Sequence, residues 1–219
     1  MDLISVAFPL AWQWGALALL IPLLAWALFT APWRRFDSSE SVHVWYGAIL
    51  ATTLLWGVKA SVGTAFTFHL LGVSIMTLLV GARLALLGVA VVVAVVIVLR
   101  DGFWANYALN VLAMGAVPVS ITMALLRAAE RYFPPNLFVY FFVVAFFGSG
   151  LAMAGSGLVA LAASILGAGQ PLTVLDEYMP YLLYLAFGEA TVSGMLMTLI
   201  VVYRPSWVAT FDDARYLQR

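Results

Sequence analysis

The stretch that decides the fold is residues 84–99, LALLGVAVVVAVVIVL, which contains no charged side chain. A helix of about 20 apolar residues crosses the ~30 Å hydrocarbon core of a bilayer. Further apolar runs lie on both sides of this one along the chain. The expected spans cover approximately residues 10–29, 42–58, 68–81, 84–99, 107–126, 137–166 and 178–203. The sequence therefore predicts an all-α integral membrane protein with about seven transmembrane helices.

The amino-acid composition excludes several classes of protein. Of the 219 residues, 65% are hydrophobic and 9% are charged, whereas a soluble domain is about half apolar and a quarter charged. The formal net charge is zero, which argues against nucleic-acid binding through a basic surface. The absence of cysteine excludes disulfides, iron–sulfur clusters and thiolate metal sites. The sequence contains no Walker A, HExxH or GxSxG motif, so we expect no enzymatic activity and no organic cofactor.

The basic residues predict the orientation in the membrane. If the spans alternate in direction, one side carries Arg34, Arg35, Arg83, Arg127, Arg131, Arg204, Arg215 and Arg219. The other side carries only Lys59 and Arg100. The positive-inside rule makes the first side cytoplasmic, so the N-terminus is expected outside and the C-terminus inside. We expect one transmembrane domain, residues 1–203, and a short cytoplasmic amphipathic tail, residues 204–219, in a multi-pass protein of the inner (plasma) membrane.

Two short patterns predict local structure. Asp37 precedes the second span and is its expected N-cap, with Glu40 three residues later as a capping-box partner. In the sixth span, Gly-Ser-Gly occurs at residues 148–150 and again at 155–157. Such small side chains predict close packing between neighbouring helices.

Ionisable side chains inside a membrane are costly, and each is therefore a functional hypothesis. His69, at the outer end of the third span, is either a metal ligand or an interfacial histidine. Glu189, halfway along the seventh span, is a structural hydrogen-bond anchor, a residue of a cation pathway or an acid held neutral. Asn110 is either a structural residue, which holds a bend or a loop through its amide, or a ligand, and we favour the structural role. His43 lies at the inner end of the second span, so the two histidines would not share one metal ion.

Several segments taken together resemble the CbiM/NikM-type substrate-capture subunits of energy-coupling-factor transporters for cobalt and nickel. The family's patterns are close to "GDGG…LGANxxNMG" and to a late "GxxEAxxT" helix. The matching pieces are HLLG at 69–72 after the small-residue loop 61–67, RDG at 100–102, ALNVLAMG at 108–115, and GEA at 188–190 with Thr198. They occur in the family's order, across about residues 60–200.

The resemblance implies a membrane protein that binds a divalent metal ion, Ni²⁺ or Co²⁺, as its substrate at the outer face. A transmembrane coupling protein and two ATPase subunits would drive the import, as in an ABC transporter. The family holds the metal through the N-terminal amine, a histidine at position two, backbone nitrogens and the HLLG histidine. On this chain, the resemblance gives His69 and the Met1 amine as ligands. It gives Asp101, Asn110 and Glu189 as structural or pathway residues.

The chain departs from the family at its start. It begins Met1-Asp2-Leu3, where the family begins Met-His. Asp2 would then supply an oxygen ligand in place of an imidazole nitrogen, which gives a harder site with less preference for nickel. The loop before His69 also lacks the family's paired glycines.

Three functions are compatible with these observations. The first is a metal-capture subunit that works with a coupling protein and ATPases. The second is a structural or assembly subunit of another membrane complex, which keeps the fold but has lost the metal site. The third is a channel or transporter with Glu189 in its pathway. All three place the chain among membrane lipids, and the first two also place it in contact with other membrane proteins.

Overall fold

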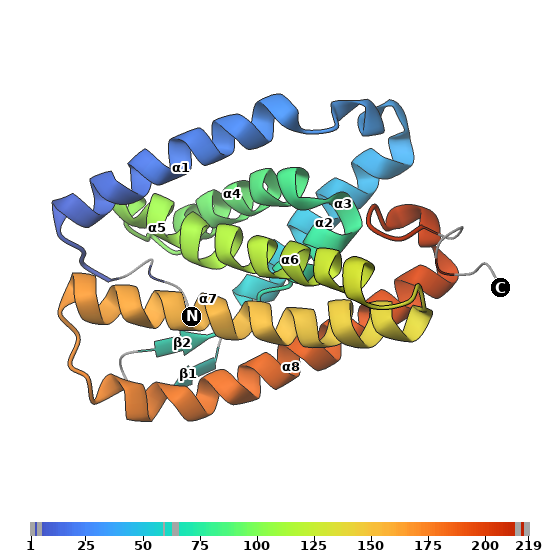
Figure 1. Ribbon diagram of the computed structural model, residues 1–219. Helices are drawn as coiled ribbons and strands as arrows, with labels where there is room; N and C mark the ends of the chain where they lie inside the picture. The colour runs from blue at the N-terminus through green and yellow to red at the C-terminus, as the bar shows by residue number, and fades with distance from the viewer. Residues whose placement is uncertain (1–2, 4–5, 59, 63–65, 213–215, 217–219) are drawn as a thin grey trace.

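The helices run roughly side by side, with their turns gathered at two opposite ends of a bundle (Figure 1). This computed structural model describes residues 3, 6–58, 60–62, 66–212 and 216. The first half contains α1 (Leu10–Thr30), the 3₁₀ turn η1 (Trp33–Asp37), α2 (Ser39–Gly57), the strands β1 (Ala60–Val62) and β2 (Phe66–Phe68), α3 (Val73–Val80) and α4 (Ala82–Leu99). The second half contains η2 (Trp104–Asn106), α5 (Tyr107–Val111), η3 (Leu112–Ala116), α6 (Val117–Tyr132), η4 (Val139–Phe147), α7 (Gly148–Ala168), α8 (Val174–Tyr203) and η5 (Pro205–Trp207).

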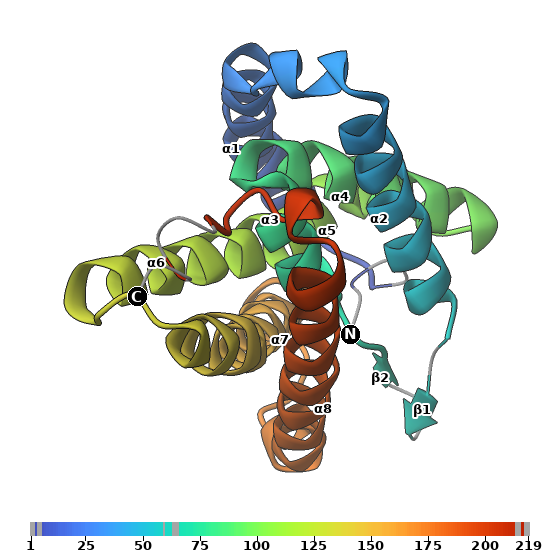
Figure 2. The same ribbon diagram turned by 90° about the vertical axis from the view of Figure 1, so that its right-hand side faces the viewer.

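Within the described residues, five helical segments are long and apolar enough to cross a membrane. These are Leu10–Thr30, Ala82–Leu99, Trp104–Tyr132, Val139–Ala168 and Val174–Tyr203. The predicted all-α membrane fold is therefore confirmed. α2, with 19 residues, has the length of a span, but its first turns are polar. The antiparallel pair β1 and β2, in which Ala60 faces Phe68, lies outside the helices (Figure 2).

The expected span at residues 68–81 is wrong. The helix in this region, α3, has eight residues, which is about 12 Å at 1.5 Å per residue. Glycines with positive φ bound it on both sides, Gly72 at 66° and Gly81 at 83°. In α3 every residue except Ile75 is buried, so its apolarity reflects the protein core and not lipid contact. The segment before it, residues 69–72, enters the bundle as a loop.

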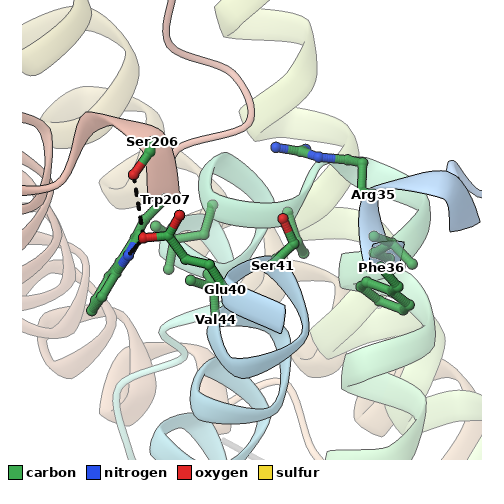
Figure 3. Close-up of a pocket in the computed structure, with 10 residues that line it drawn as sticks. Arg35, Phe36, Glu40, Ser41, Val44, Ser206 and Trp207 are labelled. Carbon is green, nitrogen blue, oxygen red and sulfur yellow. Dashed lines mark hydrogen bonds between the residues drawn. The ribbon is translucent and has the colours of Figure 1, made fainter. Parts of the chain in front are cut away.

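The expected N-cap of α2 is also wrong. Asp37 is the last residue of η1, and the cap is Ser38, whose hydroxyl accepts a hydrogen bond from the Ser41 backbone N–H at 3.3 Å. Glu40 makes no capping box; its carboxylate instead accepts from the Trp207 indole at 2.8 Å (Figure 3). The Ser38 side chain is short, so its hydroxyl reaches the backbone N–H three residues further on. It supplies the acceptor that this N–H lacks within the helix.

The glycines of the sixth span pack as the sequence predicts. A Cβ added at Gly150 would lie 3.1 Å from the Ala186 carbonyl oxygen, so α7 and α8 approach closely at this point. A Cβ at Gly157 would overlap Leu182 of α8, and one at Gly155 would overlap Ile121 of α6. The two Gly-Ser-Gly triplets thus bring α7 against a neighbour on either side.

After α8, the chain folds back against the C-terminal end of α3. The backbone N–H of Ala209 donates to the Leu79 carbonyl at 2.9 Å, and that of Thr210 donates to Leu78 at 3.3 Å. The Thr210 hydroxyl also bonds the Tyr140 hydroxyl at 2.9 Å. The first part of the expected tail is therefore packed onto the bundle, although its cytoplasmic location stays a prediction.

Candidate functional site

His69 occupies the loop between β2 and α3. Its side chain is 3% exposed, and its ring centroid lies 5.0 Å from that of Trp56 at the end of α2. The imidazole Nδ1 lies 3.0 Å from the Leu70 carbonyl oxygen. A hydrogen bond from Nδ1–H to a carbonyl sets the tautomer, and Nε2 is then the basic nitrogen. This arrangement suits a metal ligand, because second-shell contacts of this kind orient ligating histidines.

The residues that follow His69 are bound to α8. The Glu189 carboxylate accepts the Leu71 N–H on one oxygen and the Gly72 N–H on the other, each at 2.8 Å. The Glu189 side chain is 2% exposed. A carboxylate at this depth needs partners, and two backbone donors supply them. The geometry favours the structural role among the three open for Glu189.

The same loop is bound to α2 on its other side. The Trp56 indole N–H donates to the Leu71 carbonyl at 2.8 Å. Trp56 is itself held at the end of its helix, because the Arg100 guanidinium donates to the carbonyls of Trp56 and Gly57 at 3.2 and 3.1 Å. A cation at a helix C-terminus also interacts favourably with the helix dipole.

The N-terminal segment is held inside the bundle by two asparagines. The Asn110 Oδ1 accepts the Leu3 N–H at 2.9 Å, and the Asn106 Nδ2 donates to the Leu3 and Val6 carbonyls at 2.9 and 2.6 Å. The Asn110 Nδ2 in turn donates to the Asn106 carbonyl at 2.9 Å. Leu3 is 0% exposed. The Asn110 amide thus holds the backbone of Leu3 on one side and that of Asn106 on the other.

Asn106 was missed by the sequence reasoning. Its signal was its spacing, because an asparagine four residues before Asn110 lies on the same helical face. A polar pair on one face of a membrane helix predicts a shared polar partner inside the protein. The Leu3 backbone is that partner.

A family model for the "cobalt uptake substrate-specific transmembrane region", CbiM, matches residues 5–207. The chain belongs to the CbiM family. The resemblance seen in the motifs is thereby confirmed. No curated protein matches this chain. As a CbiM member, the chain is a multi-pass transmembrane component of cobalt uptake, in a family of transporter components and not of enzymes.

The CbiM match begins at residue 5, after the two other expected ligands. Met1 and Asp2 also lie outside the described residues. Among the residues that the structure does describe, no group of three or more His, Cys, Asp or Glu side chains could hold a metal ion. Met1 and Asp2 stay predictions.

The second histidine is remote from this site. His43 is exposed in the first turns of α2, and Trp56 lies 13 residues further along the helix. At 1.5 Å per residue this separation is about 20 Å. Because Trp56 contacts His69, the two histidines sit at opposite ends of α2.

Asp101, expected from the CbiM pattern as a structural or pathway residue, ends α4. Its φ is 50°, and the Gly102 N–H beyond it donates to the Ile97 carbonyl at 3.0 Å. This is the hydrogen-bond pattern of a Schellman C-cap, with Asp101 in the left-handed position. Asp101 therefore has a clear backbone role.

An apolar groove of about 360 Å³ lies beneath the His69 loop, between α2 and α8. Leu70 and Gly72 line it near the loop, and Trp207 lines it toward the other end. Glu189 also borders it, but both carboxylate oxygens are engaged by the loop. A groove lined mostly by apolar side chains is a poor path for a divalent ion, which counts against a cation pathway through Glu189.

Proposed function

We propose that this chain captures a divalent transition-metal ion at the outer face of the plasma membrane, as the membrane subunit of an energy-coupling-factor transporter. The observation that carries the proposal is His69, a buried imidazole on a loop whose backbone is bound by both α2 and α8. A ligand fixed in this way needs little reorganisation when the ion arrives. Membership of the CbiM family supports the metal as the substrate.

The proposed ligands are the His69 imidazole, the Met1 amine and the Asp2 carboxylate. The asparagine pair supports this set, because it draws the backbone of Leu3 into the bundle two residues after Met1. Two nitrogens and one carboxylate oxygen suit Co²⁺ or Ni²⁺, and the oxygen makes the site harder than one with a second imidazole. The ion is the transported substrate.

The distribution of arginines supports the orientation. Arg34 and Arg35 lie in the turn between α1 and α2, and Arg83 lies at the start of α4. These turns share the end of the bundle where α8 finishes (Figure 1). By the positive-inside rule this end is cytoplasmic, and the end with the His69 loop is then nearer the outside.

Energy for import would come from partner subunits. The chain contains no Walker A sequence, so it does not bind ATP in a P-loop of its own. A transmembrane coupling protein with two ATPases supplies that function in the proposed assembly.

The decisive experiment measures bound metal on purified protein without an N-terminal tag. After equilibration with Ni²⁺ or Co²⁺ and removal of free ion, elemental analysis should find about one ion per chain. His69→Ala should abolish binding, whereas His43→Ala, which removes the chain's other imidazole, should retain it. Binding should also weaken below about pH 6, where a typical imidazole takes up a proton.

The alternative is an assembly subunit that has lost the metal site. The observation that favours it is Asp2, where the family has histidine. Wild-type protein that retains no metal under these conditions would exclude the capture function and support this alternative. A stable complex with another membrane protein, isolated without metal, would then be expected.

A further inference from the structure

Leu71, two residues after His69, has both of its backbone polar groups bound by side chains from other helices. Its N–H donates to Glu189 of α8, and its carbonyl accepts from Trp56 of α2, both at 2.8 Å. The next N–H, that of Gly72, donates to the second Glu189 oxygen. These three bonds connect the loop to two helices that are far apart in the sequence. We call Glu189, Trp56 and their bonds to Leu71 and Gly72 the loop clamp.

The loop clamp is built into the protein interior. Glu189 is 2% exposed and Trp56 is 1% exposed. The Leu70 side chain packs close to α8: a Cβ added at Gly188 would lie 3.6 Å from it, which is ordinary van der Waals contact. At this depth water does not replace a lost hydrogen bond, so each bond of the clamp constrains the loop strongly.

The loop clamp also fixes the backbone where the loop enters α3, at Gly72. The φ of 66° at this glycine places the chain in the left-handed region just before α3. The N–H groups at the start of a helix have no partner within the helix, and the Glu189 carboxylate accepts two donors at this point. One carboxylate therefore fixes both the entry to α3 and the backbone next to His69.

We propose that Glu189 and Trp56 are positioning residues for metal capture: the loop clamp holds the His69 imidazole in the orientation that binds the ion, although neither side chain binds the ion itself. This inference rests on the proposed function. It predicts that a variant with a broken clamp has an altered orientation and accessibility of the His69 imidazole while the rest of the fold is kept. If Glu189 and Trp56 had only a structural role, their substitution would lower stability and leave the His69 imidazole as accessible as in the wild type.

The test uses two substitutions: Glu189→Gln keeps the shape of the side chain, and Trp56→Phe keeps an aromatic but smaller one. Glu189→Gln leaves one acceptor oxygen for two N–H donors, because an amide NH₂ replaces the other oxygen. Trp56→Phe removes the donor to Leu71 and keeps an aromatic ring beside His69. Ser193→Ala is the matched control, since Ser193 is 1% exposed and lies one turn further along α8.

The first measurement needs no metal. Diethylpyrocarbonate modifies neutral imidazoles, and mass spectrometry of peptides reports His69 and His43 separately in the same sample. At about pH 8 a typical imidazole is neutral, so the ratio of the two rates reports access and orientation. We expect the His69 rate relative to His43 to rise several-fold in Glu189→Gln and Trp56→Phe, and to stay at the wild-type value in Ser193→Ala.

The second measurement is Ni²⁺ affinity, with thermal stability recorded in parallel. We expect a loss of about 10- to 100-fold in both clamp variants, the range found when partners of a metal ligand are removed. An unchanged His69 rate in both clamp variants would refute the inference, even if affinity fell. If wild-type protein bound no metal, the proposed function would fail, whereas the labelling would still decide whether the clamp positions His69.

Discussion

The indole N–H of Trp207 donates a 2.8 Å hydrogen bond to the Glu40 carboxylate and so connects the segment after α8 to the first turn of α2. The Ser206 hydroxyl approaches the same oxygen at 3.4 Å (Figure 3). The cavity lined by these residues measures about 10 Å³, which is the space of one water molecule. The contact therefore connects the segment after α8 to α2, and the space beside it is too small for a ligand larger than one water molecule.

Trp207→Phe tests how much the Trp207–Glu40 hydrogen bond contributes to stability. It keeps the ring and removes the donor, and we expect a loss of about 1 kcal/mol of stability because the bond has a charged acceptor but is partly exposed. Thermal unfolding in detergent gives the measurement. Glu40→Ala should add little to the loss in the double variant. Fully additive effects would mean that the two side chains act independently.

Substitution of either asparagine, Asn106 or Asn110, should release the N-terminal segment from the bundle. Asn110→Ala leaves the buried Leu3 N–H without its acceptor, and Asn106→Ala leaves the Leu3 and Val6 carbonyls without their donor. Each change should cost about 1–3 kcal/mol. Limited proteolysis should show faster cleavage near the N-terminus. Asn136→Ala, at an exposed asparagine, should cleave like wild type; equal cleavage in all variants would contradict the role of the pair.

Gly72→Ala should destabilise the fold through both strain and contact. The left-handed φ costs an L-residue about 1–2 kcal/mol, and the new Cβ would lie 3.1 Å from Leu55 Cδ2. Gly169→Ala separates these causes, because Gly169 has a φ of 68° with nothing within 4 Å of an added Cβ. We expect Gly72→Ala to lower the unfolding temperature more than Gly169→Ala. An equal fall in the two variants would show that the Leu55 contact relaxes without cost, and a larger fall in Gly169→Ala would contradict the prediction.

Asp101→Gly should stabilise the protein. Asp101 has a φ of 50° at the end of α4, and glycine adopts this conformation without the steric cost of a Cβ. Relief of the left-handed conformation is worth about 1–2 kcal/mol, and the greater freedom of glycine in the unfolded chain offsets about 0.4–1 kcal/mol of it. We therefore expect a net gain of stability in thermal unfolding, with Ni²⁺ binding unchanged. A variant that loses metal while remaining folded would instead assign Asp101 to the capture site.

The spans that were predicted correctly have a signal contained within the span itself. Residues 84–99 are apolar throughout, and length with hydropathy is enough to identify such a helix. The segment at 68–81 failed because hydropathy does not separate a short helix buried in protein from one in lipid. Gly72 and Gly81, which enclose the eight residues of α3, were the available signal for a shorter element.

The sequence indicated two residues of the candidate site, but it did not indicate the hydrogen bonds and contacts between them and the rest of the chain. His69 and Glu189 stand out as ionisable groups within apolar runs. The bond from Leu71 to Glu189 joins positions 118 residues apart, and no local pattern encodes such a pair. Trp56 gave no signal at all, because tryptophan at the end of a membrane helix is common. Its contact with His69 depends on how α2 packs against the loop.

The hydrogen bonds from Ala209 and Thr210 to the carbonyls of Leu79 and Leu78 join the end of α3 to a segment that is synthesised after α8. Because synthesis runs from the N-terminus, residues 209 and 210 are added after α1 to α8 are complete. The last carbonyls of α3 therefore form these two bonds only after more than half of the chain has been added behind α3. Until residue 210 is added, the Leu78 and Leu79 carbonyls at the C-terminal end of α3 lack these two donors. A chain shortened to residue 208 would therefore lack both hydrogen bonds between α3 and the segment after α8.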